Sequence, residues 1–440
     1  MDYQKRREAL ARQLPARSVA VFANPSPKRR SGDQDYPYRA DSNMIYLTGM
    51  DEAEAVAIIA SQEQSVPFRL FVLKRDPERE RWVGTRYGTE GAKAIFGADE
   101  AYPIDDLREE LKSILLPLDA VYFDFSQSAT VAPMLFEITE ELRHRGRHSS
   151  EGPRQFCDVR DIVGEMRRVK DADEIEVMKR AAHVSAIGFQ EVLKMLKPGV
   201  GEYQVEATLQ HAFRMQHAMG ESFGSICAGG AHATTLHYEE NRDILKDGDL
   251  ILIDAGAEVD YYAGDISRTF PVNGVFTPAQ RDIYSLVLRA QKAGIDACLA
   301  GNHMKTPHEA VRAVFAQGLH DLGICSESPK EILEKNIDFE FYFHGTSHYL
   351  GIDTHDVGIA YERGGMDTPK RLEPGVVLTV EPGLYFTPED SRVPEKYRGI
   401  GVRIEDDVLV TDSKPVVLTA ELIKEIEDIE AALRHEILAD

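Results

Sequence analysis

The sequence predicts an α/β domain at the N-terminus, followed by a larger α+β domain built from two similar halves. Three observations predict this fold class. β-rich runs alternate with amphipathic segments in the first 150 residues, a polar stretch from His144 to Arg154 is rich in loop formers, and long helical patterns precede strand patterns twice after residue 170. We therefore assign residues 1–170 to the first domain and residues 171–440 to the second.

The first domain contains short runs of β-branched and aromatic residues that have the length of strands. Amphipathic segments such as 105–116 lie between them, which favours a partly parallel sheet covered by helices. The expected strands are 18–23, 55–60, 68–74 and 120–124.

The second domain is expected to begin with a long helix. Asp171 is placed to cap this helix, and apolar residues continue at helical spacing until Lys197-Pro-Gly ends the pattern. The two halves share no letter-for-letter repeat, so the duplication is inferred from the pattern alone. The expected elements are helices at 171–196 and 202–218 before strands ending near 270, helices near 277–300 and 307–321 before strands between 378 and 412, and one amphipathic helix over the acidic segment 421–430.

Composition excludes several classes of protein. The 51 basic and 74 acidic residues give a formal net charge of −23, which repels phosphate backbones and anionic lipid, so we expect no nucleic acid or membrane partner. The apolar run 18–23 is too short for a secretion signal, and no run approaches the length of a membrane span. Four scattered cysteines without a CxxC pair favour a reducing compartment, so the expected location is cytoplasmic.

Carboxylates interrupt strand patterns that are otherwise apolar. Asp254 lies in a run that reads as a buried strand, and Asp265 follows on the next one. If Val259 and Asp260 form a two-residue turn, Asp254 faces Asp265, and a bound cation would relieve their repulsion. In the alternative the register differs and both side chains reach solvent or cap turns, because Val-Asp is not a favoured hairpin turn.

Two glutamates occupy comparable positions near the C-terminus. Glu381 closes a β-branched run and is held extended by Pro382. Period-two alternation places Arg403 and Glu405 on one face of a strand. Taken alone, Arg403 and Glu405 are equally consistent with a surface ion pair in which each side chain neutralises the other. They occur, however, together with the other acids that interrupt strand patterns.

Histidines gather in a stretch that is not helical in pattern. His344, His348 and His355 lie in a segment rich in Gly and β-branched residues, unlike the helical HExxH zinc motif. A single such histidine is more often an ordinary core or surface residue. Three of them, together with acids in strands, indicate a functional site, and His237 is a further candidate.

This donor set predicts a metal-dependent hydrolase. One imidazole with four carboxylates is a hard, oxygen-rich set that favours Mn²⁺ over a thiolate-type zinc site. Four acids are too many for one divalent ion. Two ions about 3.5 to 4 Å apart, bridged by carboxylates and a water, would balance the charge and supply a hydroxide at neutral pH.

These residues resemble the five metal ligands of the pita-bread metallopeptidases in order and in context. Within that group the chain is most similar to the aminopeptidase P branch, through Tyr36-Pro-Tyr-Arg39, Tyr46-Leu-Thr-Gly49 and Tyr397-Arg-Gly-Ile-Gly401. The matching ligand contexts are Asp254 in Leu-Ile-Asp-Ala-Gly, Asp265 in Gly-Asp-Ile-Ser-Arg-Thr-Phe, His348 in His-Gly-x-Ser-His, Glu381 in Val-Glu-Pro-Gly and Glu405 in Arg-Ile-Glu-Asp-Asp.

The resemblance implies a pita-bread (creatinase/aminopeptidase) fold for the C-terminal catalytic domain and two Mn²⁺ per subunit. It implies an Xaa-Pro aminopeptidase that releases the N-terminal residue from peptides with proline at the second position, assembled as a homo-oligomer, a dimer or a tetramer. The implied roles are Asp265 and Glu405 bridging both ions, Asp254 completing one ion, His348 and Glu381 completing the other, Glu381 handling the proton of the water, His237 and His355 stabilising the tetrahedral intermediate, and His344, Tyr385 and Arg403 lining the proline pocket.

The sequence departs from the family pattern at Ser267, Tyr349 and Thr354, none of which is a ligand, so these departures bear on fine substrate preference and not on the metal chemistry. Trp82 is similar to an aromatic residue that family members place near a neighbouring subunit's active site, and core packing is its equally weighted alternative. Three rival functions remain open: prolidase acting on Xaa-Pro dipeptides, a metal-free creatinase-like enzyme, and a non-catalytic binding module.

Overall fold

A computed structural model describes residues 1–144, 151–361 and 368–437. The chain divides into two compact units, Met1–Arg167 and Arg168–Asp440, each described here by itself. Within the described residues, no helix is long and apolar enough to cross a membrane. The expected polar connection at 144–154 lies mostly outside the described residues.

The first unit contains a six-stranded mixed sheet in the order β6-β5-β4-β1-β7-β8. β1 pairs with β7 in parallel and with β4 in antiparallel orientation, which confirms the expected partly parallel sheet. The helices and strands of this unit are α1 (Tyr3–Gln13), β1 (Ser18–Ala23), β2 (Arg29–Ser31), β3 (Gln34–Asp35), α2 (Ser42–Thr48), β4 (Val56–Ala60), β5 (Phe68–Val72), α3 (Pro77–Val83), α4 (Gly88–Ala94), β6 (Glu100–Pro103), α5 (Leu107–Leu115), β7 (Ala120–Phe123), α6 (Ser128–Arg143), β8 (Gln155–Asp158) and α7 (Arg160–Arg168), which ends at the boundary.

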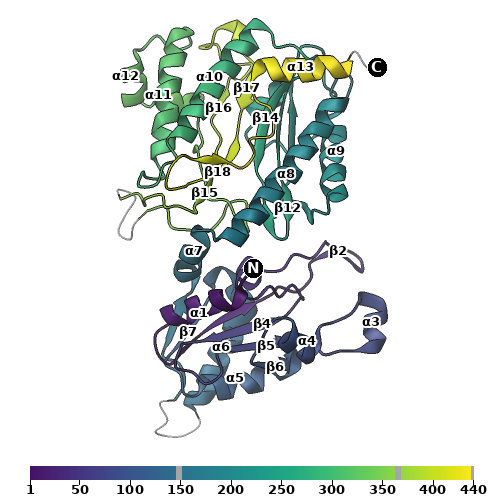
Figure 1. Cartoon of the computed structure of the whole chain (residues 1–440), viewed down its shortest axis with the longest axis vertical. Helices are drawn as coiled ribbons and strands as arrows, with labels where there is room; N and C mark the ends of the chain where they lie inside the picture. Colours follow the sequence, from purple (N-terminus) through teal and green to yellow (C-terminus); the bar gives the residue numbers. More distant parts are fainter. Residues whose placement is uncertain (145–150, 362–367, 438–440) are drawn as a thin grey trace. The chain divides into compact units, whose positions relative to one another are not determined.

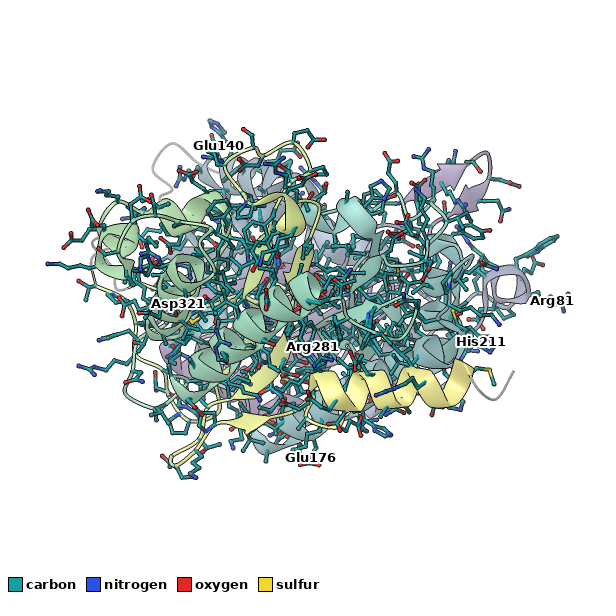
Figure 2. All side chains as sticks on the ribbon, turned by 90° about the horizontal axis from the view of Figure 1, so that it is seen from above. Arg81, Glu140, Glu176, His211, Arg281 and Asp321 are labelled. Carbon is teal, nitrogen blue, oxygen red and sulfur yellow. The ribbon has the colours of Figure 1, made fainter. Side chains whose placement is uncertain are left out.

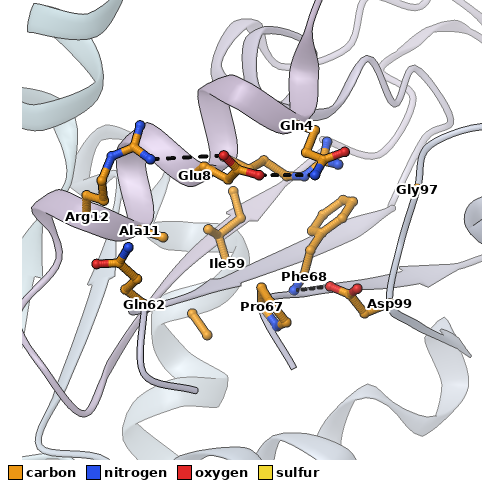
Figure 3. A pocket seen from close by; sticks show the side chains of 12 residues that line it. Gln4, Glu8, Ala11, Arg12, Ile59, Gln62, Pro67, Phe68, Gly97 and Asp99 are labelled. Carbon is orange, nitrogen blue, oxygen red and sulfur yellow. Dashed lines mark hydrogen bonds and ion pairs between the residues drawn. The ribbon is translucent and has the colours of Figure 1, made fainter. Parts of the chain in front are cut away.

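Every residue of β1 and β4 is buried, because helices cover both faces of the sheet. Leu111 of α5 and Leu135 of α6 pack on Val21 and Ile58 from one face, while α1 and α2 contact β4 and β1. A cavity of about 290 Å³ lies beside α1 (Figure 3). Its carboxylates are already engaged, since Glu8 accepts from Gln4 and Asp99 accepts from the backbone N–H of Phe68.

In the second unit, two pairs of helices flank the strands, α8–α9 in teal and α10–α11 in green (Figure 1). Asp171 caps α8 through a reciprocal capping box with Glu174, as predicted. The elements of this unit are α8 (Ala172–Met195), α9 (Glu202–Met215), β9 (Gly220–Glu221), β10 (Ile226–Gly229), β11 (Leu250–Ala255), β12 (Ala257–Val259), β13 (Tyr262–Ala263), β14 (Ile266–Pro271), α10 (Pro278–Asp296), α11 (Thr306–Asp321), α12 (Pro329–Glu334), β15 (Val377–Val380), β16 (Gly383–Tyr385), β17 (Gly401–Arg403), β18 (Asp406–Leu409), β19 (Val416–Val417) and α13 (Ile426–Ile437).

The hairpin that carries Asp254 has a different register from the one considered first. Its turn is Asp260–Tyr261, with φ of 47° and 71°, so the left-handed turn begins one residue later than Val259–Asp260. Asp254 therefore pairs with Ser267, and the expectation that it directly faces Asp265 is wrong. The shift is by two residues along the partner strand, so Asp254 and Asp265 stay on one face as diagonal neighbours.

The second half of the unit contains a comparable pair of strands. Val380 pairs with Asp406 and Gly383 pairs with Arg403, so the register on both sides of the interruption places Glu381 opposite Glu405. Each half thus contributes two acids from two neighbouring strands. This arrangement agrees with the two similar halves that the repetition of helices and strands predicted.

The C-terminal helix begins later than expected. The segment 421–425 is not helical, and α13 starts at Ile426, where apolar residues first recur on one face. Arg281 of α10 pairs with Glu427 and Glu430 of α13. Labelled charged residues such as Glu176 and Asp321 lie on the outside of the unit (Figure 2).

Candidate active site

The predicted site residues converge on one cleft of about 690 Å³ in the second unit. Tyr385 differs from the others: it is 2% exposed and lies behind the wall of the cleft. Trp82 belongs to α3 of the first unit and is 88% exposed, so the core-packing alternative for this residue is wrong. The predicted residues that line the cleft are Asp254, Asp265, His348, Glu381, Glu405, His237, His344, His355 and Arg403.

A three-residue cluster at the centre of the cleft has the geometry of a metal site. Ligand atoms of Asp265, His348 and Glu405 lie within 4.8 Å of one another. His348 Nε2 is 3.5 Å from Asp265 Oδ2 and 3.7 Å from Glu381 Oε1. The other ring nitrogen of His348, Nδ1, is 3.0 Å from the carbonyl oxygen of Tyr349, which orients the ring with Nε2 toward the acids.

Asp254 is held at the edge of this cluster by Arg403. One guanidinium nitrogen of Arg403 donates to Asp254 Oδ2 at 2.6 Å, and the others donate to Ser267 Oγ at 2.8 Å and to the Tyr385 hydroxyl at 3.0 Å. Among the described residues, the second carboxylate oxygen of Asp254, Oδ1, is buried with no hydrogen-bond partner. That oxygen is available to a ligand.

The central acids have too little positive charge around them. Burial raises the pKa of Asp265 well above its ordinary value, and the negative charge of Asp254 adds to the effect. Burial and the neighbouring Asp265 likewise raise the pKa of Glu405 well above its ordinary value. Burial raises the pKa of Glu381 to about 7, against the opposing effect of His348. Bound cations would reverse these shifts, because they stabilise the ionised carboxylates.

Three residues that sequence reasoning did not assign to the site support the ligands. The Ser267 hydroxyl donates to Glu405 Oε2 at 2.8 Å, Asp407 Oδ2 accepts from the backbone N–H of Asp265 at 3.3 Å, and Thr379 Oγ1 accepts from the backbone N–H of His348 at 3.2 Å. The acidic triplet Glu405-Asp406-Asp407 inside a strand was a signal for Asp407, since strands rarely bury three acids. Ser267 and Thr379 had no such signal.

Two further predicted histidines, His344 and His355, line the cleft with lowered pKa values. Burial, with a smaller contribution from Arg403, lowers the pKa of His344 to about 3, and its Nε2 is 2.8 Å from the Tyr385 hydroxyl. The His355 ring contacts that of His348 at a centroid distance of 4.4 Å, and burial and this neighbour lower the pKa of His355. Neutral imidazoles keep one N–H each, so they can donate to a carbonyl oxygen at neutral pH.

The donor set fits a divalent metal. Carboxylates and one imidazole converge within coordinating range, the described acids of the cleft share the guanidinium of Arg403, and Asp254 has a buried oxygen free to coordinate. A metal-binding site is therefore supported by the chemistry of these residues.

Comparison with known proteins agrees with this geometry. The chain is 39% identical over 434 residues to the Xaa-Pro aminopeptidase of Escherichia coli K12, covering 98% of this chain and 97% of the relative. It is 40% identical over 429 residues to the Xaa-Pro aminopeptidase of Haemophilus influenzae, covering 98% and 96%.

Solved structures of similar sequence have the same fold. The aminopeptidase PepP of Pseudomonas aeruginosa superposes with a TM-score of 0.97 at 40% identity, covering 99% of this chain and 98% of that one. Zinc-substituted Escherichia coli aminopeptidase P in complex with product gives a TM-score of 0.95 at 38% identity, covering 99% and 98%.

Family profiles divide the chain as its two units do. The aminopeptidase P N-terminal domain matches residues 3–122, and metallopeptidase family M24 matches residues 176–412, a segment that includes every predicted ligand. The predicted fold class, an α/β domain followed by a pita-bread catalytic domain, is confirmed. With more than half of its residues in this match and relatives similar along almost its whole length, the chain belongs to metallopeptidase family M24.

Proposed function

We propose that this protein is an Xaa-Pro aminopeptidase, which releases the N-terminal residue from peptides whose second residue is proline. Relatives that carry this name align over nearly all of both chains. The observation that carries the proposal is the set of buried acids whose pKa values are raised because they have no adequate cationic partner. Such a set is unfavourable in a purely structural role and suits the binding of divalent metal.

Two Mn²⁺ ions per subunit are the proposed cofactor. Asp265 and Glu405 would bridge the two ions, Asp254 would complete one ion, and His348 with Glu381 would complete the other. The hard oxygen-rich donor set favours Mn²⁺ over a thiolate-seeking metal. Bound divalent ions supply Lewis acidity and lower the pKa of a water molecule.

Glu381 is the proposed proton carrier. A bound water needs a base when it attacks, and the leaving proline nitrogen needs an acid when the bond breaks. The Glu381 carboxylate can do both, because it lies in the cleft with Oε1 3.7 Å from His348 Nε2.

His237 and His355 are proposed to stabilise the tetrahedral intermediate. Both line the cleft, and burial, with a smaller contribution from His348, lowers the pKa of His355. A neutral ring donates an N–H to the oxygen that becomes negative, and that hydrogen bond strengthens as the charge develops.

His344, Tyr385 and Arg403 are proposed to form the proline pocket. His344 and Tyr385 have ring centroids 5.5 Å apart, and Arg403 links Tyr385 to Asp254 through its guanidinium. Because Tyr385 is buried, its part is to hold His344 and Arg403, which form the wall that a substrate meets.

Hydrolysis of Ala-Pro-Ala, Ala-Pro and Ala-Ala-Ala, each with and without added Mn²⁺, tests the function. We expect rapid cleavage of Ala-Pro-Ala, little cleavage of Ala-Ala-Ala, and dependence on metal. Cleavage of Ala-Pro alone would favour prolidase. Full activity without metal would favour a creatinase-like enzyme, and metal-free, inactive protein would favour a binding module.

Three further properties are proposals of the same kind. Residues 1–170 and 171–440 would act as the N-terminal and catalytic domains. The protein would assemble as a homo-oligomer, and the exposed indole of Trp82 is a surface that a second copy could cover. A cytoplasmic location is proposed because all four cysteines are free thiols.

A further inference from the structure

His237 lies on a segment with little regular structure. After the short 3₁₀ turn Gly230–Thr234, residues 235–243 form neither helix nor strand, and the His237 side chain is exposed at the cleft. A residue on such a segment is not positioned by a backbone ladder. Its placement has to come from side-chain contacts nearby.

Glu202 supplies those contacts from outside the cleft. It is the first residue of α9, its side chain is fully buried, and it does not line the cleft. Oε1 accepts from the backbone N–H of Gly229 at 2.8 Å and lies 3.1 Å from His232 Nδ1. Oε2 accepts from the Tyr238 hydroxyl at 2.9 Å and from the backbone N–H of Asp243 at 2.8 Å.

Four donors satisfy all the lone pairs that a carboxylate offers. Burial alone would raise the pKa of Glu202, but these hydrogen bonds outweigh burial and lower it, so the group stays ionised. Hydrogen bonds to a buried charge are stronger than neutral ones. Glu202 therefore joins residues shortly before the segment, its middle and its end to one rigid point.

Tyr238 transmits this constraint to its neighbour His237. Its ring stacks on His232 at a centroid distance of 4.4 Å and packs with the apolar group that includes Tyr385, behind the cleft wall. Farther along, Asn241 accepts from the backbone N–H of Cys227 at 2.9 Å and donates to the carbonyl of Ser225 at 2.8 Å, both beside β10. His237 therefore immediately precedes Tyr238, a residue whose side chain is held in place by these contacts.

We propose that Glu202, acting through the Tyr238 hydroxyl, is the positioning residue that holds the His237 imidazole at the cleft. This inference rests on the proposed role of His237 in stabilising the intermediate. Glu202 touches neither substrate nor metal ligands, so its effect reaches the reaction only through His237. A displacement of an oxyanion donor by about 1 Å can lower the rate by up to about 10²-fold.

The test is a double-mutant cycle with Tyr238→Phe and His237→Ala, measured on Ala-Pro-Ala. Tyr238→Phe keeps the ring and its stacking but removes the hydroxyl. We expect it to lower kcat about tenfold with KM within about twofold and bound metal unchanged, because the lost interaction serves the transition state. In the His237→Ala background, Tyr238→Phe should cause no further loss of kcat.

Tyr397→Phe is the matched control, since it removes a buried tyrosine hydroxyl that also donates to a carboxylate, Asp282 Oδ2 at 2.8 Å. It should leave kcat unchanged. Glu202→Gln is the second variant, and its loss of kcat should equal or exceed that of Tyr238→Phe.

The outcomes separate the two hypotheses. If His237→Ala alone keeps the wild-type kcat, the proposed role of His237 is wrong, and the positioning role is wrong with it. If His237→Ala lowers kcat but Tyr238→Phe does not, or lowers kcat equally with and without His237, only the positioning role of Glu202 is overturned.

Discussion

Two groups of buried carboxylates lie next to each other in the second unit, and their pKa values are shifted in opposite directions. Glu405 and Asp265, 2% and 4% exposed, have pKa values raised by burial and by a neighbouring carboxylate, Asp265 for Glu405 and Asp254 for Asp265. Asp406, the next residue along the chain, is fully buried as well. Burial alone would raise the pKa of Asp406, but Arg268 and Lys424 outweigh it and lower that pKa.

The difference lies in the partners that the chain supplies. Asp406 Oδ1 accepts from Arg268 at 2.8 Å and from the Thr419 hydroxyl at 2.7 Å, and its Oδ2 accepts from Gln291 at 2.6 Å and from Lys424 at 2.5 Å. The acids of the cleft share one buried guanidinium, that of Arg403. A carboxylate whose partners are all within the protein is structural, whereas a group of carboxylates short of cations is prepared for an external one.

Metal removal should have the largest effect and tests the cleft side of this comparison. We expect a chelator to abolish hydrolysis of Ala-Pro-Ala, because it removes the cations that balance the buried acids and act as Lewis acids in the reaction. The raised pKa values of Asp265 and Glu405 reflect this lack of counter-charge. Mn²⁺ should restore activity best among Mn²⁺, Zn²⁺, Mg²⁺ and Ca²⁺. Activity that survives in protein shown to contain no metal would contradict the assignment.

Neutralising Asp406 and neutralising Glu405, one at a time, should change the free energy of unfolding by very different amounts. Asp406→Asn leaves Arg268 and Lys424 without a buried counter-charge and should lower the free energy of unfolding by about 3 to 5 kcal/mol. Glu405→Gln in metal-free protein removes one of several like charges, so its effect on unfolding should be below about 1 kcal/mol although activity is lost. Denaturant unfolding of both variants after chelation checks this, and equal destabilisation would remove the distinction.

Replacing a cleft histidine should affect rate without affecting stability or metal. His355→Ala should lower kcat by about 10²-fold, the usual result of losing an oxyanion donor, with bound metal and the unfolding midpoint nearly unchanged. Steady-state kinetics with metal quantified in the same samples measures this. A variant with the wild-type kcat would show that His355 takes no part in the mechanism.

His308 of α11 is an intermediate case, a half-buried imidazole that contacts hydroxyl groups. Its Nδ1 is 2.8 Å from Thr346 Oγ1, and burial, assisted by Arg312, lowers the pKa of His308 to about 4. The unfolded chain binds this proton at higher pH than the folded one, so folding loses stability as the pH falls from 6.5 toward 4.

His308→Gln removes that titration. Between pH 7 and pH 5 the wild type should lose about 2 kcal/mol more unfolding free energy than the variant. Urea unfolding of metal-free protein at both pH values gives the difference. The same pH dependence in both proteins would show that this ring is not the group responsible.

Local sequence was sufficient to predict most of the elements and the residues that line the cleft. The cap at Asp171, the buried strand containing Asp254 and the alternation around Glu405 depend on residues within a turn or a strand of one another. The family motifs added the identity of the site, because each ligand lies inside a short recognisable run. The predicted fold, the family and the convergence of these residues on one cleft follow from that information.

Only the tertiary structure decided the register and the partners. The turn at Asp260–Tyr261 needs two consecutive left-handed residues, which no residue type there demands, so the local sequence disfavoured Val259–Asp260 as the turn without predicting the turn that forms. Likewise, Glu405 and Asp406 are adjacent acids in one motif, and nothing local shows that Arg268, Gln291 and Lys424 converge on the carboxylate of the second and not on that of the first. Electrostatic energy in a folded chain depends on distance in space, and residues far apart in sequence set that distance.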